Sequence, residues 1–555
     1  MFKLAVVFVF LVVSLSGNDF KKLLDFAIKG DIKKIEILLK KIEDENLKNV
    51  YKEATLRYAS LGRDTKEQLQ IMQFLIDNGV NINAKDRLGI DALSSSIMSE
   101  NTEMAEYLLN NGADANSRDN RGFTVLMLAS VQGNFTLVKN LIGRGAKIND
   151  KSDEGDTALF FAAKNGKLDI VKYLITMGTS IDAINENNIT PLFNATEKGN
   201  TSVVSYLLSK GASIDMEDKN GRTPLMWAAI NNHLETVKVL LENGSDINRT
   251  DNHQRSSLLL AVNSNNIELV EYLILKGADL SVKDKDGNGI VTSAIWRNNI
   301  KIIEYFIENN ISLLAKNNEG TTSLMLAARE GNIKLAQHLL DEGAHVNECN
   351  KIGGTALSKA VFGANKEMVE FLISKNAKVK SNSHYVLMAA VRKDSSELVE
   401  ILLNHGANVN SKDKSYGSSA LMEASYKGNL NIIKLLVGHG ANINYKNKHG
   451  STALMKATLK NQKEIIVYLL KKGANINLKD NNGRTAFLTA TAYSDLGTVK
   501  LLLNMGANIN DTNTEGENGL TLTKKLNRAN KEGIVNLLLD KGIIMNKNRI
   551  EDSTK

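Results

Sequence analysis

The sequence predicts an all-α solenoid, a chain of short helical units stacked one on the next. A glycine recurs every 33 residues through most of the chain, and we call its position the phase marker. It falls at Gly89, Gly122, Gly155, Gly221, Gly287, Gly320 and Gly353, with Asn188 and Gln254 in the same phase. A second glycine series runs in parallel from Gly79 to Gly343. A fixed period of this length is typical of units that bury their apolar face only against their neighbours.

The first residues differ from the repeats and predict a secretory signal peptide over residues 1–16. Lys3 supplies a positive charge, residues 4–15 are almost wholly apolar, and Ser14 and Ser16 are the small residues of a cleavage site. The apolar run is too short to span a hydrocarbon core of about 30 Å as a helix. We therefore expect export to the periplasm or out of the cell, with no transmembrane segment after cleavage. The alternative is a cytoplasmic protein in which this segment is a first helix.

One unit shows how the helices are specified. Thr223 is a helix N-cap residue, and Pro224 follows it at the first helical position. Leu225, Met226, Ala228 and Ala229 give the first helix an apolar side, and Asn231-Asn232 ends it. Val237, Leu240 and Leu241 give a second helix the spacing of a buried face, and Gly244 ends that helix in the left-handed conformation.

The N-cap position can be followed along the whole array, two residues after each phase marker. Twelve of its fourteen residues are Ser, Thr, Asp or Asn, the preferred N-cap types. They are Asp91, Thr124, Thr157, Thr190, Thr223, Ser256, Gly289, Thr322, Thr355, Tyr385, Ser419, Thr452, Thr485 and Asn518. Each of these positions is therefore predicted to start a helix.

The unit resembles the ankyrin repeat. The matching residues are Gly-x-Thr-Pro/Ala-Leu (Gly221 to Leu225, Gly450 to Leu454), the Ala-Ala and Leu-Leu pairs, and Gly-Ala-x-Ile-Asn (Gly473 to Asn477). The resemblance implies an ankyrin-repeat solenoid of about 14 regular units, preceded by two divergent ones. We divide the chain into the signal peptide (1–16), divergent units (17–86), a regular array (87–515) and a C-terminal capping unit with its tail (516–555). Lys524, Lys525, Arg528, Asn530 and Lys531 make that last unit suited to face water.

Two departures from the family pattern carry expectations. The family's histidine after Thr-Pro-Leu is replaced by methionine or phenylalanine, as at Met127 and Phe160, which predicts loops that are less rigidly tied. The repeat also shortens to 30 residues between Gly353 and Ser383, where the N-cap position becomes Tyr385. We expect a local defect in the stack there.

No motif predicts catalysis, a cofactor or a metal site. Residues 284–290 resemble the start of a calcium-binding EF-hand loop, but Ile295 stands where that site needs a glutamate. His405 and His439 precede terminal glycines and are expected at helix C-termini, facing the negative end of the dipole. Cys349 is expected to be an incidental surface thiol. The 69 basic and 62 acidic residues leave a net charge of only +7 with no dense basic run, which disfavours nucleic-acid binding.

The remaining function is protein binding. By resemblance to ankyrin arrays, the concave surface includes the residues nine and ten past each phase marker. From Gly287 onward these become aromatic in every second unit, with basic residues between and beside them. The candidate partner-binding residues are Trp296, Arg297, Arg329, Phe362, Arg392, Lys393, Tyr426, Lys427, Lys460 and Tyr493.

Aromatic and Arg side chains are the ones that binding hot spots favour, and the positive charge suits a protein partner with acidic and apolar groups. The opposing interpretation is that the rings cover gaps between units. The leading prediction is thus an exported, non-catalytic interaction scaffold. Its rivals are a secreted effector or toxin acting on a host cell, and an intracellular scaffold.

Overall fold

The computed structural model describes residues 18–62, 65–380, 383–525 and 531–543, so the predicted signal peptide, Arg528, Asn530 and the C-terminal tail lie outside the described residues. The chain divides into two compact units, an N-terminal half (Met1–Asp284) and a C-terminal half (Lys285–Lys555). Within the described residues there are thirty-two helices and no strand. The predicted all-α fold, with two divergent helix pairs before fourteen regular ones, is confirmed.

The helices alternate between a first and a second helix of each repeat unit. In the N-terminal half they are α2 (Asn18–Lys29), α3 (Ile32–Lys40), α4 (Glu45–Ala59), α5 (Thr65–Asp77), α6 (Ala92–Met98), α7 (Thr102–Asn110), α8 (Val125–Gln132), α9 (Phe135–Gly143), α10 (Ala158–Lys164), α11 (Leu168–Thr176), α12 (Pro191–Glu197), α13 (Thr201–Ser209), α14 (Pro224–Ile230), α15 (Leu234–Glu242), α16 (Ser257–Asn263) and α17 (Ile267–Leu275).

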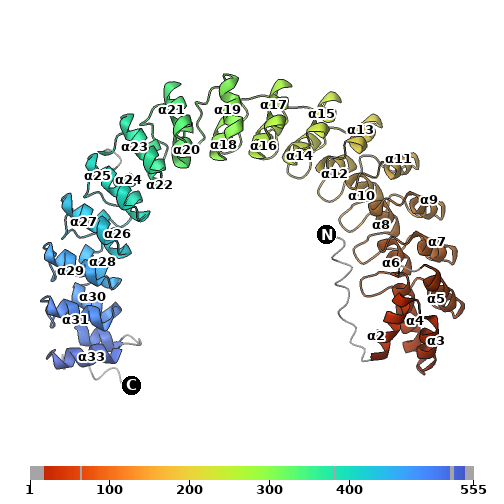
Figure 1. Cartoon of the computed structure of the whole chain (residues 1–555), viewed down its shortest axis with the longest axis horizontal. Helices are drawn as coiled ribbons and strands as arrows, with labels where there is room; N and C mark the ends of the chain where they lie inside the picture. Colours follow the sequence, from red (N-terminus) through yellow and green to blue (C-terminus); the bar gives the residue numbers. More distant parts are fainter. Residues whose placement is uncertain (1–17, 63–64, 381–382, 526–530, 544–555) are drawn as a thin grey trace. The chain divides into compact units, whose positions relative to one another are not determined.

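The C-terminal half continues the same alternation. Its helices are α18 (Ile290–Trp296), α19 (Ile300–Glu308), α20 (Ser323–Glu330), α21 (Ile333–Asp341), α22 (Ala356–Phe362), α23 (Lys366–Ser374), α24 (Ser383–Arg392), α25 (Ser396–Asn404), α26 (Ala420–Lys427), α27 (Leu430–Gly438), α28 (Ala453–Leu459), α29 (Lys463–Lys471), α30 (Ala486–Tyr493), α31 (Leu496–Asn504), α32 (Gly519–Lys525) and α33 (Lys531–Asp540). In each half the even-numbered helices line one side of the stack and the odd-numbered helices the other (Figure 1). We call the side made by the even-numbered helices and the turns before them the first-helix face.

The predicted N-caps start the helices, with one exception. Thr124 is typical, because its hydroxyl accepts the Met127 N–H at 3.2 Å. Thr157 and Thr190 are N-caps whose side chains make no capping bond. The prediction for Tyr385 is wrong, because α24 begins two residues earlier, at Ser383. The missing phase marker in that unit removed the local signal on which the prediction depended.

The core lies between neighbouring helices. Leu225, Met226, Ala228 and Ala229 of α14 are buried, as their apolar pattern predicts. Val237 and Leu240 of α15 are buried as well, but Leu241 is only half-buried. Successive residues are about 100° apart around a helix, so Leu241 falls at the edge of the face that Leu240 centres.

The turn before each first helix is stabilised by local hydrogen bonds and a glycine, as the turn at residues 119–123 shows. Asp119 accepts the backbone N–H groups of Arg121 and Phe123 at 2.9 and 2.8 Å, which closes a tight turn. Gly122 sits in that turn at φ 75°, a left-handed conformation that favours glycine. The turn is then tied to the next unit, because the Asp153 N–H donates to the Arg121 carbonyl at 2.9 Å.

A ladder of asparagines joins the loops that follow the second helices. The Asn116 amide donates to the Gly145 carbonyl at 3.1 Å and accepts the Lys147 N–H at 2.8 Å. Asn83, Asn410 and Asn444 make the same pair of bonds to the unit that follows. Bonds between units therefore tie these loops at a position other than the family's histidine. Met127 even supplies a substitute acceptor, since its sulfur lies 3.4 Å from the Thr124 nitrogen.

Candidate functional site

The ten candidate residues lie at or just beyond the C-terminal ends of first helices in the C-terminal half. Trp296, Phe362 and Tyr493 end α18, α22 and α30, and Tyr426 is the penultimate residue of α26. Their side chains stay in contact with solvent, with exposed fractions of 53%, 62%, 48% and 41% in that order. Among the six cations, Arg329 is half-buried, and Arg297, Arg392, Lys393, Lys427 and Lys460 are exposed.

The structure places a cation over each of the four rings. Arg329 Cζ lies 3.9 Å from the ring centroid of Trp296, and Lys460 Nζ lies 4.5 Å from that of Tyr426. Lys393 Nζ is 5.6 Å from the ring of Phe362. Each of these cations comes from the unit after the ring. Sequence reasoning placed the basic residues beside the rings, and the geometry shows three of them stacked above.

The fourth ring is held by a residue that sequence reasoning missed. Arg484 Cζ is 5.9 Å from the Tyr493 ring, and its Nη1 donates to the Tyr493 hydroxyl at 3.2 Å. Arg484 directly follows the phase marker Gly483, at the start of the same unit. A basic residue just after the phase marker is the signal that could have found it.

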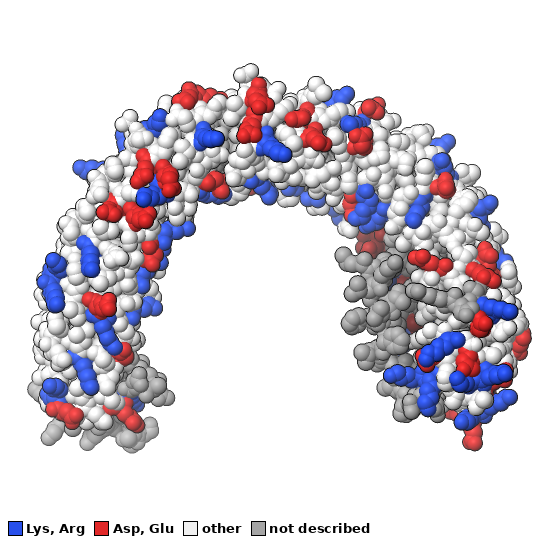
Figure 2. Space-filling model, viewed as in Figure 1, with Lys and Arg blue, Asp and Glu red and all other residues white. Residues whose placement is uncertain are grey.

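The surface around these rings is predominantly positive. Lysine and arginine side chains lie along this edge of the C-terminal half (Figure 2). Two acidic residues temper the charge: Glu330 pairs with Arg329 at 2.7 Å, and Glu423 lies 3.8 Å from Arg392. An exposed ring beneath a cation offers a partner both apolar area and a charge that is partly shielded from water.

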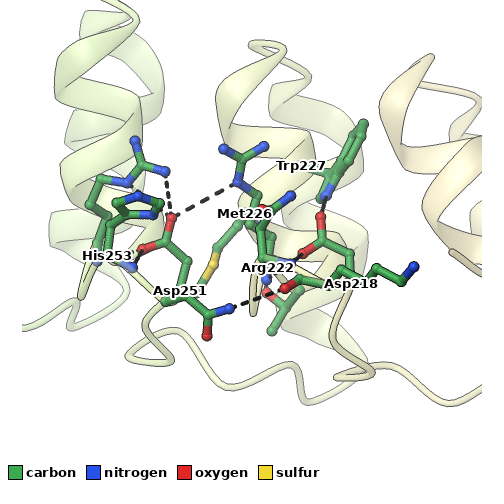
Figure 3. A network of polar contacts seen from close by, with 11 residues as sticks. Asp218, Arg222, Met226, Trp227, Asp251 and His253 are labelled. Atoms are coloured by element: carbon green, nitrogen blue, oxygen red, sulfur yellow. Dashed lines mark hydrogen bonds and ion pairs between the residues drawn. The ribbon is translucent and has the colours of Figure 1, made fainter. Parts of the chain in front are cut away.

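A different cluster lies in the N-terminal half, around the other tryptophan (Figure 3). The half-buried Trp227 donates its indole N–H to Asp218 at 3.0 Å. Its ring meets that of Phe193 edge-on, with centroids 6.3 Å apart. This ring is thus packed and hydrogen-bonded within the array.

Asp251 is the charged centre of that cluster (Figure 3). Its buried carboxylate accepts from Arg255 Nε and Nη2 at 2.9 and 2.6 Å, and Arg222 Nε lies 3.9 Å away. Burial alone would raise the pKa of Asp251, but the hydrogen bonds from Arg255 and from backbone N–H groups outweigh it, and the pKa is lowered. Asp251 and Arg222 come from adjacent turns, so the arrangement links these turns. The carboxylate of Asp251 and the two guanidinium groups face one another within the array.

The residues weighed for metal binding or reactivity have structural positions. His405 and His439 donate from Nδ1 to the carbonyls of Ile401 and Leu435, at 2.8 and 2.9 Å, at the C-terminal ends of their helices as expected. Ile295 is buried in α18, and Cys349 is exposed. Across the described residues, no group of three or more His, Cys, Asp or Glu side chains could hold a metal ion.

A comparison with protein families identifies the repeat. A family model described as ankyrin repeats, in three copies, matches residues 56–152, 93–185, 126–218, 159–251, 258–350, 336–413, 387–480 and 421–513. A search of curated proteins finds no match. Within the described residues, no helix combines the length and apolar character needed to cross a membrane. Ankyrin repeats indicate a protein–protein interaction scaffold, and proteins built from them are typically not catalytic. The chain belongs to the ankyrin-repeat family.

Proposed function

We propose that the protein is a non-catalytic scaffold that binds protein partners on the first-helix face of its C-terminal half. The contact surface comprises Trp296, Arg297, Arg329, Phe362, Arg392, Lys393, Tyr426, Lys427, Lys460 and Tyr493. The observation that carries the proposal is the set of four exposed rings, each beneath a cation.

Exposure supports binding over gap-filling. A ring whose role was to close the space between two units would be largely hidden, as Trp227 partly is. Phe362 instead keeps well over half of its side chain in contact with solvent. Apolar area of this kind leaves water when a partner covers it, which favours binding.

The charge pattern selects the partner. Lys393 and Lys460 already lie against rings, so a carboxylate that meets them forms an ion pair beside an apolar contact. Charge of one sign along a surface also increases the rate at which an oppositely charged protein associates. The partner that fits is a protein with acidic groups interspersed with apolar ones.

The binding test uses charge reversal on matched faces. The immobilised full chain should capture its partner, and Arg392→Glu with Lys427→Glu should lower the capture at least tenfold. The matched control is Lys301→Glu with Lys334→Glu, two exposed lysines on second helices, which should leave capture unchanged. Equal losses in both variants would contradict the proposed surface.

We also propose that the protein acts outside the cytoplasm, in the periplasm or beyond the cell. The support is the charged, apolar and small-residue sequence of residues 1–16. Cleavage is expected after Ser16, so N-terminal sequencing of the native protein should begin at or near Gly17. Recovery of soluble cytosolic protein that retains Met1 would contradict export.

A further inference from the structure

Two repeat units of the C-terminal half carry an exposed apolar side chain at both ends of the first helix. Ile352 lies in the turn before α22, and Phe362 is the last residue of that helix. Tyr416 lies in the turn before α26, and Tyr426 is near the end of that helix. Ile352 and Tyr416, in the turns, are exposed by 65% and 60%. The turns before α18 and α30 instead present Asp286 and Asn482 at this position, although those helices also end in a ring. In the described residues, the double arrangement occurs only in the units of α22 and α26.

Hydrogen bonds of the main chain fix the two turns that carry these side chains. The Gly353 N–H donates to the Asn350 carbonyl at 2.8 Å, and the Lys351 N–H donates to the Glu319 carbonyl of the preceding unit at 3.0 Å. The Tyr416 N–H donates to Asp413 at 2.6 Å, and the Tyr416 carbonyl accepts the Lys448 N–H at 3.0 Å. A turn whose backbone is ordered before a ligand arrives loses little conformational entropy on binding.

Cations lie between the two apolar pairs. α24 packs against both α22 and α26, and it ends at Arg392, which Lys393 follows. Both side chains are exposed, and Lys393 lies over the Phe362 ring. Glu423 lies 3.8 Å from Arg392, the Asp413 carboxylate also interacts with Arg392, and the exposed Asp394 follows Lys393, so the charge of this strip is partly offset. A ligand that joins the two apolar pairs therefore passes over Arg392 and Lys393.

The spacing determines what can join them. Stacked helices lie about 8–10 Å apart, so α22 and α26, two units apart, are separated by roughly 20 Å. An extended chain advances about 3.3 Å per residue, and about six residues cover that distance. The separation between α22 and α26 thus matches the distance between two side chains about six residues apart in one extended segment.

We propose that α22, α24 and α26 bind an extended segment of the protein partner. The segment carries two large apolar residues about six positions apart, with carboxylates between them. One apolar residue lies between Ile352 and Phe362, the other lies between Tyr416 and Tyr426, and the carboxylates meet Arg392 and Lys393. This inference rests on the proposed function and specifies the partner of the same surface.

Synthetic peptides test the spacing. Fluorescence anisotropy with the full chain should show that a labelled peptide with two phenylalanines about six residues apart, separated by glutamates, binds about tenfold more tightly than a peptide of the same composition with adjacent phenylalanines. A third peptide, with glutamines in place of the glutamates, should also lose about tenfold and become insensitive to salt. Equal affinities for the spaced and adjacent peptides would overturn the inference.

Substitutions locate the site. Ile352→Ser with Tyr416→Ser should weaken the spaced peptide about tenfold without changing the melting transition, because both side chains are exposed. Leu88→Ser is the matched control: it alters an exposed turn residue of the N-terminal half and should change nothing. Unchanged peptide binding by the double variant would overturn this inference, while partner capture that still responds to Arg392→Glu with Lys427→Glu would leave the proposed function intact.

Discussion

The two tryptophans of the chain show how its two halves differ. Trp227 in the N-terminal half is half-buried, hydrogen-bonded to Asp218 and packed on Phe193. Trp296 in the C-terminal half is exposed at the end of its helix, with Arg329 above it. The same repeat thus uses an aromatic ring for internal cohesion in one half and leaves it at the surface in the other. Family membership alone does not locate a binding surface, and the proposed surface rests on this difference.

The arginines that follow the phase markers show the same contrast. Arg222 lies near Asp251 of the next unit, so its charge is taken up within the array. Arg484 has the equivalent position in the C-terminal half, but the next unit offers Asn513 in place of the aspartate. Its guanidinium donates to Tyr493 instead. In these two units the arginine lies near a buried carboxylate where one is present, and near an exposed ring where asparagine replaces it.

Deletions of repeat units are expected to have the largest effects on folding and on partner binding. Removing Gly221–Val237, about half a unit, should abolish stacking from that point, because the helix faces no longer meet. Removing the whole unit Gly221–His253 keeps the phase, so the shorter chain should stay folded and bind its partner as before. Circular dichroism, limited proteolysis and partner titration measure the three outcomes.

The corresponding deletion in the C-terminal half is the control. Removing Gly320–Ile352 also keeps the phase but takes away Arg329 and Ile352 and brings Trp296 one unit closer to Phe362. The chain should fold, and its affinity for the partner should fall at least tenfold. Two whole-unit deletions with the same effect on binding would show that the halves do not differ in function.

Truncating the rings should separate binding from stability. Trp296→Ala, Phe362→Ala and Tyr426→Ala together should weaken partner binding about a hundredfold, as expected for hot-spot side chains, and change the free energy of unfolding by under about 1 kcal/mol. Trp227→Ala should do the reverse, with a loss of about 2 kcal/mol and unchanged binding, because it removes packing and leaves Asp218 without its indole donor. Titration calorimetry and thermal unfolding give the two readouts. A large stability loss in the triple variant, with binding intact, would place those rings in the core.

The sequence predicted what each unit determines locally. A capping residue such as Thr124 and a left-handed glycine such as Gly122 act within a few residues, so their roles follow from spacing alone. Exposure of the rings at unit ends was also predictable, because the apolar core positions were already assigned. The Tyr385 prediction failed where the phase marker is missing and local spacing gives no register.

Contacts between units could not be predicted from the spacing. Arg329 and Trp296 are 33 residues apart, and only the direction of the helix ends brings them together. The bond from Trp227 to Asp218 lies within one unit, but it likewise depends on the ring turning back towards the turn before its own helix. Such pairings depend on side-chain rotamers in two elements, which a repeat pattern does not specify.

Replacing Asp251 tests the charge within the N-terminal half. Asparagine serves as the turn acceptor in other units, as Asn447 does, so Asp251→Asn keeps the backbone bonds and removes the charge that faces Arg255. We expect a loss of about 1–2 kcal/mol at neutral pH, measured by chemical unfolding, with partner binding unchanged.

The pH dependence of this variant follows from the lowered pKa of Asp251. A carboxyl whose pKa is lower in the folded state stabilises the fold above its unfolded pKa and loses that effect as the pH falls. The difference between Asp251→Asn and the parent should therefore shrink below about pH 4. A difference that stays constant into acid would assign the loss to something other than the charge.

Asp156 has the opposite electrostatic environment in the same half. It lies in the turn before α10 and accepts the Asn185 side-chain amide at 2.8 Å. Burial raises the pKa of Asp156, and this effect outweighs the hydrogen bond from Asn185. Its ionised form is therefore less favourable in the folded chain than in the unfolded one, and protonation favours folding.

The smallest predicted effect is accordingly a gain. Asp156→Asn keeps an oxygen to accept from Asn185 and removes the charge, so it should stabilise the protein by roughly 0.5 kcal/mol at neutral pH, after allowance for solvent screening. The sign follows from the raised pKa: the gain should be full above the folded pKa and vanish as the pH falls through it, because the parent is then protonated too. Chemical unfolding at two pH values, beside Asp251→Asn, measures both. If Asp156→Asn were instead destabilising at neutral pH, burial would not be the dominant influence on this carboxyl, and the turns of the N-terminal half would use all their carboxylates alike.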